Sequence, residues 1–308
     1  MFKNLINDRF AFQLGRQRFE DERQWLYEAE LDGVRGFFLY ENFFSELSVT
    51  RGGLVDRDLI NDDVADKTNN YIFNSSYEFK EDTLAGIYLV YRDDTTSENN
   101  SPFFIGFHSE AELTDEIEFW ADAAYVAGKD GDNDISAFGF DVGVIYIFDT
   151  FFEPYITLGY AFGSGDGDPE DSKDKNFRQT GLQGNEGDFN GAVDFLYYGE
   201  VFDPELSNLS IITAAIGVNP TEETSIDLVY HYYRQAKASE EIRESAIDAD
   251  PDGINKSLGN EIDLILGYEG FGERVAFGLF FGYFIPGDAF PSDSGNAFLT
   301  KILMEYEF

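Results

Sequence analysis

Apolar and polar side chains alternate along most of this chain with a period of two residues. In AFGFDVGVIYIF every second residue from Phe138 to Phe148 is apolar, while Gly139, Asp141 and Gly143 lie between them. The same pattern recurs in PYITLGYAFG, SIDLVYHYY, NEIDLILGYE, RVAFGLFFGYFI and the final AFLTKILMEYEF. A period of two places successive side chains on opposite faces of a strand. The pattern predicts an all-β protein.

The less apolar face of these strands is unusual for a soluble protein. It carries glycine, alanine and scattered acids, whereas the water-exposed face of a soluble sandwich is rich in Lys, Thr and Glu. Strands of roughly ten residues with an apolar outer face, a polar inner face and aromatic girdles are typical of membrane barrels. Closure also removes sheet edges, which are costly in lipid. We predict an antiparallel transmembrane β-barrel in preference to a large soluble β-protein.

Loop lengths set the expected topology, because such barrels have short periplasmic turns and longer outer loops. Short inner turns are expected at 41–42, 80–82, 114–115 and 149–152, and at NPTEE and EGFGE. Outer loops are expected at 20–27, 51–69, 94–101, 128–136, 235–258 and 286–295. The alternation holds if NFRQTGLQ (Asn176–Gln183) is itself a strand, with GNEGD as an inner turn and DPELSN outside. The chain then has about 16 strands, beginning near Phe10 and ending with Phe308 on the periplasmic side.

Composition narrows the function classes. The chain has 308 residues, and its 60 acidic and 21 basic residues give a net charge of −39, which excludes a nucleic-acid partner. It has no cysteine, hence neither disulfides nor thiolate chemistry, and no apolar run long enough for a membrane-spanning helix. MFKNLINDRF lacks the apolar centre of a signal peptide. His108 and His231 are both expected to point inward, and no Ser/His or Asp/His motif indicates an enzyme. No cofactor is expected.

A set of short motifs resembles a known protein family. LGRQRFEDERQWL, LDGVR, GYAFGSGDGD, FRQTGLQGN, YYGEVFDPELSNL and VYHYYRQ, in this order, resemble the alginate-export porin family of Gram-negative outer membranes. The resemblance runs from about Phe10 to Phe308. It implies a monomeric eighteen-stranded barrel whose narrow, arginine-lined pore passes a polyuronate such as alginate. On this interpretation residues 1–308 form one barrel domain, and the signal peptide and first hairpin are missing.

The resemblance places four arginines in the pore: Arg16 and Arg18 of GRQR, Arg35 of LDGVR and Arg178 of FRQTG. A guanidinium binds carboxylates bidentately and keeps its charge, and several weak sites in a row ease the passage of a polyanion. The alternative is that these arginines pair with wall acids and brace the interior. Arg16 and Arg18 share the outward alternation of the residues before them, so a β-bulge at Gly15 is needed to turn them inward.

Several features depart from a simple basic pore. Acids are also expected to face inward, namely Asp122, Asp141, Asp194, Asp227, Glu261, Asp263 and Glu305. The turn at 270–273 is short, whereas the alginate exporter that the chain resembles carries a long periplasmic loop there. The acidic loops DGDND and DADPDG lack a complete Ca²⁺ ligand set, so no metal site is assigned.

Two other functions therefore stay open. One is a general or small-solute porin with a lumen of mixed charge, and the other is a structural or adhesive barrel that acts through its loops. The expected partners are an anionic polysaccharide, outer-membrane lipid and lipopolysaccharide, and periplasmic export proteins.

Overall fold

The structure is a computed structural model that describes residues 2–3, 9–52, 67–95, 99–272 and 274–306. Over these ranges the regular elements are all β-strands. The described residues accordingly include no helix of the length and apolarity that crossing a bilayer requires.

The main sheet has 16 strands, of which two are only two residues long. The other fourteen follow one another in chain order, each antiparallel to the next. They are β2 (Phe10–Glu20), β3 (Glu28–Tyr40), β4 (Phe43–Arg51), β5 (Thr68–Lys80), β6 (Thr83–Asp94), β7 (Asn100–Thr114), β8 (Ile117–Asp130), β9 (Asn133–Ile147), β10 (Tyr155–Gly163), β14 (Leu209–Thr221), β15 (Thr224–Gln235), β16 (Ser257–Gly270), β17 (Val275–Pro286) and β18 (Ala297–Tyr306).

Four short strands complete the description. β1 (Phe2–Lys3) pairs with β2, and β11 (Lys173–Asp174) runs parallel to the start of β9. β12 (Glu186–Gly187) and β13 (Phe195–Leu196) pair with each other in a separate small sheet.

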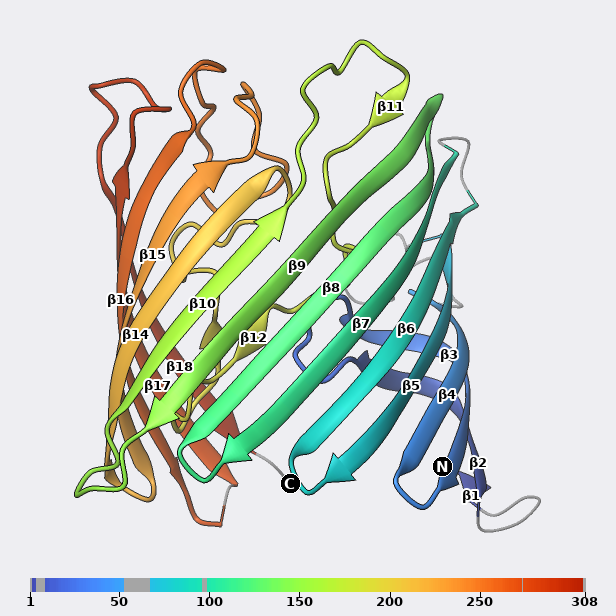
Figure 1. Ribbon diagram of the computed structural model, residues 1–308, viewed down its shortest axis with the longest axis vertical. Helices are drawn as coiled ribbons and strands as arrows, with labels where there is room; N and C mark the ends of the chain where they lie inside the picture. The colour runs from blue at the N-terminus through green and yellow to red at the C-terminus, as the bar shows by residue number, and fades with distance from the viewer. Residues whose placement is uncertain (1, 4–8, 53–66, 96–98, 273, 307–308) are drawn as a thin grey trace.

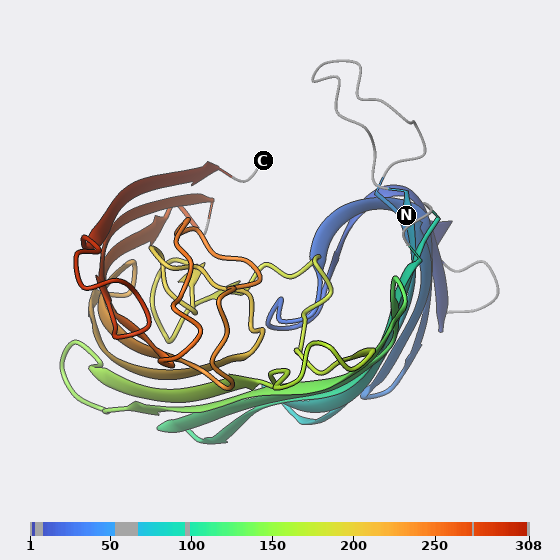
Figure 2. The same ribbon diagram turned by 90° about the horizontal axis from the view of Figure 1, so that it is seen from above.

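The main sheet is tilted and strongly curved, so that it encloses a lumen (Figures 1 and 2). Seen from above, the wall forms an open curve, with the first and last strands at its two ends (Figure 2). Within the described ranges no pairing joins β18 to β1 or β2. The all-β antiparallel architecture is as predicted.

The two faces of the wall differ as the alternation predicts. In β9, Phe138 and Val142 on the outer face are 50% and 40% exposed, whereas Ala137 and Asp141 on the lumen face are 2% and 3% exposed. The outer face carries most of the exposed large apolar side chains, among them those of β7, β10 and β14. An apolar outer surface of this kind suits a lipid environment.

The predicted strand at Asn176–Gln183 is wrong. β10 pairs directly with β14, so the whole of 164–208 connects two neighbouring strands at one end of the sheet and folds back into the lumen (Figure 2). Gly181, with φ of +75°, interrupts an extended conformation, and Gln179 and Thr180 bond to the interior of the protein instead of to a wall strand. The strand implied between GNEGD and DPELSN is also absent, apart from the two residues of β13.

Because these two predicted strands are lost together, every other connection keeps its predicted side. The predicted short turns are tight turns at 41–42, 81–82 and 115–116, as expected for the periplasmic end. The expected sixteen long strands become fourteen. Most of the predicted outer loop 51–69, and the terminal Phe308, lie outside the described residues.

Candidate functional site

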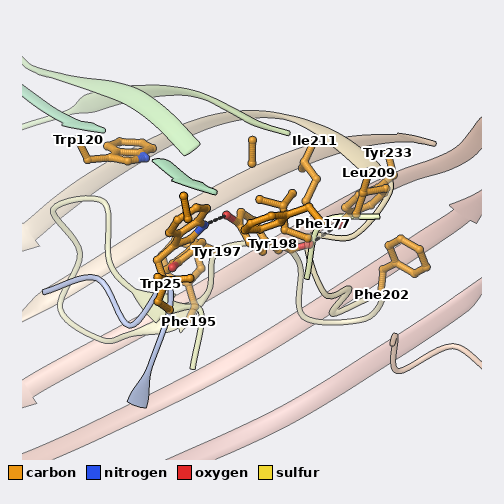
Figure 3. Packing of buried hydrophobic residues seen from close by; sticks show 14 of the residues in the cluster. Trp25, Trp120, Phe177, Phe195, Tyr197, Tyr198, Phe202, Leu209, Ile211 and Tyr233 are labelled. Atoms are coloured by element: carbon orange, nitrogen blue, oxygen red, sulfur yellow. Dashed lines mark hydrogen bonds between the residues drawn. The ribbon is translucent and has the colours of Figure 1, made fainter. Parts of the chain in front are cut away.

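Two of the segments that fill the lumen pack on each other. We call residues 164–208 the plug and residues 21–27 the β2–β3 loop. Trp25 of the loop donates a hydrogen bond from Nε1 to the Tyr198 hydroxyl at 2.8 Å and stacks on Phe177 of the plug, with 5.9 Å between ring centres (Figure 3). Phe177 packs on the wall at Gly139, where a Cβ would lie 2.6 Å from the ring. The pore is therefore narrowed by chain that enters from the long-loop end.

The β2–β3 loop lies at the predicted end of the sheet, but it folds into the lumen instead of lying outside it. Its apolar residues Trp25, Leu26 and Tyr27 are fully buried. Asp21 shapes the turn, because its carboxylate accepts hydrogen bonds from the backbone N–H groups of Trp25, Leu26 and Tyr27 at 2.7–2.9 Å. Burial raises the pKa of Asp21, while these N–H groups act in the opposite direction. The loop is thus folded inward around one carboxylate.

Arg23 of this loop joins the loop, the wall and the plug. Its Nη1 lies 2.7 Å from an oxygen of Asp122 and 3.3 Å from an oxygen of Asp141. Its guanidinium also lies over the rings of Trp120 and Tyr197, at 4.7 and 4.8 Å. An arginine between two acids and two aromatic faces combines charge-assisted hydrogen bonds with cation–π contacts.

Arg23 was not among the predicted pore arginines, although one signal for it existed. Asp122 and Asp141 were both expected on the lumen face, and the structure pairs them directly across β8 and β9. Like charges opposite each other destabilise a sheet, so a cation was needed between them. What the sequence does not show is which of the chain's basic residues supplies it.

Arg35 and Arg178, two of the predicted pore arginines, do lie on the lumen side. The Arg35 guanidinium is 2.5 Å from the buried Glu46 carboxylate and donates to the backbone oxygen of Arg18 at 2.9 Å. Arg178 belongs to the plug; its side chain is 3% exposed and it pairs with Asp130 at 2.7 Å and with Asp174. Both arginines are therefore paired with carboxylates of the protein itself. This agrees with the alternative that they pair with acids and brace the interior.

Arg16 and Arg18 lie elsewhere. The register of β2 with β3 is continuous through Gly15, so the predicted bulge is absent even though Gly15 has φ of +116°. Both side chains share the exposed alternation of β2 with Leu14, and Arg18 lies near enough to Asp194 of the plug to act against the rise that burial causes in the pKa of that acid. Arg16 pairs with Glu30 at 3.5 Å, and Arg18 pairs with Glu20 and Glu28 at 2.9 Å. A pore role for these two residues stays a prediction.

A cavity of about 540 Å³ lies between the plug, the β2–β3 loop and the wall, toward the short-turn end. Aromatic residues form part of it, including Trp120 and Phe189, whose rings stack at 5.7 Å. Arg23 is the basic residue of its lining, and the acids of its lining are Glu22, Asp82, Glu110, Glu112, Glu118, Glu186, Asp188 and Asp194. The cavity is therefore predominantly acidic.

Burial changes the protonation of the acids contributed by the loop and the plug. It raises the pKa of Glu22 to about 7 and that of Asp188 to about 6. It also raises the pKa of Glu186 and Asp194. Desolvation disfavours the charged form of a carboxyl group, so part of the cavity's negative charge is lost near neutral pH.

Most of the predicted inward acids are confirmed on the lumen face. Asp122, Asp141, Asp227, Glu261 and Asp263 are buried there, as are both histidines. Asp194 differs in that it lines the cavity from the plug, and Glu305 is exposed on β18. In the part of the chain that the structure describes, no group of three or more acidic or histidine side chains is placed to hold a metal ion.

Comparisons with known proteins agree with this architecture. Residues 1–299 match the alginate export family. The alginate production protein AlgE of Pseudomonas aeruginosa is 31% identical over an alignment of 169 residues, in a match that covers 49% of this chain and 33% of that protein. The same protein of Azotobacter vinelandii is 30% identical over an alignment of 144 residues, in a match that covers 44% of this chain and 29% of that protein. The matched part thus spans about a third of these relatives.

Solved structures show the same fold at low sequence identity. OpdK of P. aeruginosa, solved with vanillate, has a TM-score of 0.58 and 11% identity, covering 97% of this chain and 76% of that one. The outer membrane protein OprD of P. aeruginosa has a TM-score of 0.56 and 12% identity, covering 96% and 75%. With the family match and the apolar outer face of the wall, these likenesses lead to one assignment. The chain belongs to the alginate export family and is a porin-like β protein of the bacterial outer membrane.

Proposed function

We propose that this chain forms a monomeric barrel through which alginate, or a similar anionic polysaccharide, crosses the outer membrane. The observation that carries the proposal is the family match over residues 1–299. The proposal includes closure of the barrel, because the free edges of β1 and β18 would leave backbone groups unpaired in lipid. It also includes lipopolysaccharide as a neighbour, periplasmic export proteins as partners, and transport as the activity in place of catalysis.

Inside the lumen a polyanion would meet both arginines and acids. Arg23, Arg35 and Arg178 lie inside the wall, and each is paired with one or two carboxylates. A polyuronate entering the acidic cavity meets repulsion from ionised carboxylates and attraction to guanidinium groups. The raised pKa values of Glu22 and Asp188 reduce the repulsion as the pH falls.

A second candidate, a small-solute porin, is favoured by the cavity itself. Its volume of about 540 Å³ falls within the range of small-molecule sites, roughly 300–1,000 Å³. Its excess of acids would attract cations, because charges at a constriction with low-dielectric walls act strongly. Charge selectivity and block by oligosaccharides separate the two candidates.

Alginate oligomers are expected to block the single-channel current of the full-length protein in a planar bilayer, and to do so more strongly at lower pH. Glu22 and Asp188 have pKa values of about 7 and about 6, so they are ionised at higher pH and become neutral as the pH falls through these values. Loss of negative charge favours entry of the polyanion. Reversal potentials under a salt gradient should shift toward anion selectivity over the same pH range.

A neutral oligosaccharide of equal length serves as the control and should show no such pH dependence. A pore that prefers cations at every pH, and that alginate oligomers do not block, would contradict the polyuronate proposal and support the small-solute porin.

A further inference from the structure

A second cavity lies on the outer face of the wall, away from the lumen. The turn at 148–154, between β9 and β10, swings outward at the short-turn end (green loop in Figures 1 and 2). Between this turn and the outer faces of β10, β14 and β15 lies a cavity of about 440 Å³. Its lining is almost entirely apolar and includes Phe148, Pro154, Ile156, Ile216, Val218 and Leu228. We call this cavity the outer groove.

The turn that forms the outer groove is well fixed. The Phe148 N–H donates to the Pro154 oxygen at 2.8 Å, and the Asn219 N–H of β14 donates to the Phe152 oxygen at 2.8 Å. Phe152 and Glu153 adopt positive φ values of 73° and 42°, and the Phe151 and Phe152 rings lie 4.0 Å apart. Because the backbone is held at both ends of the turn, the groove cannot close by a simple shift of the loop.

The groove is continuous with the lipid-facing surface. Ile156, Ile216 and Leu228 are 42%, 56% and 42% exposed on the outer face of the wall. In an outer-membrane protein this face lies in hydrocarbon, and an unfilled apolar space there loses dispersion contacts. The groove lies beside the tight turns 115–116 and 222–223, which are at the periplasmic end in this topology. Its natural occupant is therefore an acyl chain of the periplasmic leaflet.

The charges around the groove select the headgroup. The three turns nearest to it carry six exposed acids, namely Asp115, Glu116, Asp149, Glu153, Glu222 and Glu223, and those turns contain no Lys or Arg. Anionic lipids are held by basic clusters, so this surface disfavours them. A primary ammonium supplies three hydrogen-bond donors to such acids. We propose that the outer groove binds one acyl chain of a phospholipid whose headgroup carries a primary ammonium.

The test uses the full chain reconstituted into vesicles of equal parts phosphatidylethanolamine and phosphatidylglycerol, extracted in mild detergent and analysed by native mass spectrometry. Wild-type protein should retain phosphatidylethanolamine in preference to phosphatidylglycerol. Ile216→Trp fills the groove and should reduce this retention about tenfold, since losing the burial of about two methylene groups is sufficient. The matched control is Ile212→Trp, on the same outer face of β14 but outside the groove lining, which should retain the lipid.

Equal retention by Ile216→Trp and Ile212→Trp, or no retained lipid in the wild type, would overturn the site. A second variant tests the headgroup without touching the apolar lining and serves also if Ile216→Trp does not fold. Asp149→Lys combined with Glu153→Lys should shift the retained lipid toward phosphatidylglycerol. An unchanged preference in that variant, or equal retention of both lipids by the wild type, would overturn the headgroup assignment.

Discussion

Replacing Arg23 by methionine is expected to lower the free energy of unfolding by about 3–5 kcal/mol, because removing one partner of a buried ion pair leaves the other charge uncompensated. The side chains of Arg23, Asp122 and Asp141 are only 13%, 3% and 4% exposed. The midpoint of thermal unfolding in detergent, followed by circular dichroism, measures the effect. Adding Asp122→Asn and Asp141→Asn should recover most of the lost stability, since the orphaned charges are then gone.

Arg16→Met is the control for this prediction. Arg16 and Glu30 form an ion pair whose side chains are 55% and 70% exposed, and exposed pairs contribute about 0–1 kcal/mol. If Arg23→Met were as stable as Arg16→Met, the Arg23 contacts would not be what fixes the β2–β3 loop inside the lumen.

Replacing residues 166–206 by a short glycine–serine linker is expected to raise the single-channel conductance severalfold. The wall does not need the plug for its continuity, because β10 and β14 pair from Tyr155↔Gly217 to Phe162↔Ser210. The backbone bond from the Asn208 N–H to the Ser164 oxygen, at 3.2 Å, would still close the hairpin. Removing the plug takes buried aromatic side chains out of the lumen and leaves open space for ions.

The control for the plug deletion is the exchange of residues 167–172 alone, which lie at the outer tip of the plug and are mostly exposed. This variant should conduct like the wild type. Equal conductance of the two variants would show that the plug does not limit the current. Planar-bilayer recordings of both proteins make the comparison.

The wall was predictable from sequence because each of its residues has one of two environments. Lipid favours apolar side chains on one face, and the packed lumen favours small or polar side chains on the other. Strands such as β9 and β17 therefore show the period of two directly in their sequence. The tight turns at one end followed from loop length. Both inferences rest on local pattern alone.

The plug was not predictable in the same way. Phe195 and Tyr197 alternate with neighbours as strand residues do, but their buried environment comes from the inside of the barrel, and sequence spacing does not separate this from strand pairing. The stretch GNEGDFNG did carry a signal, because clustered glycine, asparagine and aspartate mark loops. That signal was outweighed by the apparent need for an even alternation of sides.

For the arginines, too, only part of the arrangement was predictable from sequence. The lumen-side position of Arg35 was predicted from its motif, and this is where the structure places it. Its pairing with Glu46 depends on β4, a different strand, and the pairing of Arg178 with Asp130 depends on β8. Local spacing does not show which residue of another strand an arginine will pair with. The sequence could therefore indicate that an arginine points inward, but not which carboxylate neutralises its charge.

The contacts of the plug also fix an order of assembly. Each wall strand pairs with the next one along the chain, whereas the plug reaches the β2–β3 loop across 173 residues, from Trp25 to Tyr198, and across 174 residues, from Arg23 to Tyr197. Contacts between distant parts of a chain form slowly, because the intervening loop must first be closed. The hairpins of the wall are therefore expected to form before the plug docks.

Pulsed hydrogen exchange during refolding can follow this order. The N–H groups of Val201 and Phe202, which donate to Glu261 at 2.6 and 2.9 Å, should become protected after the strand amides of β14 and β15. Protection in the reverse order would contradict the expectation that the wall hairpins form before the plug docks. Each molecule would then pass through a stage with an unobstructed lumen before its own chain fills it.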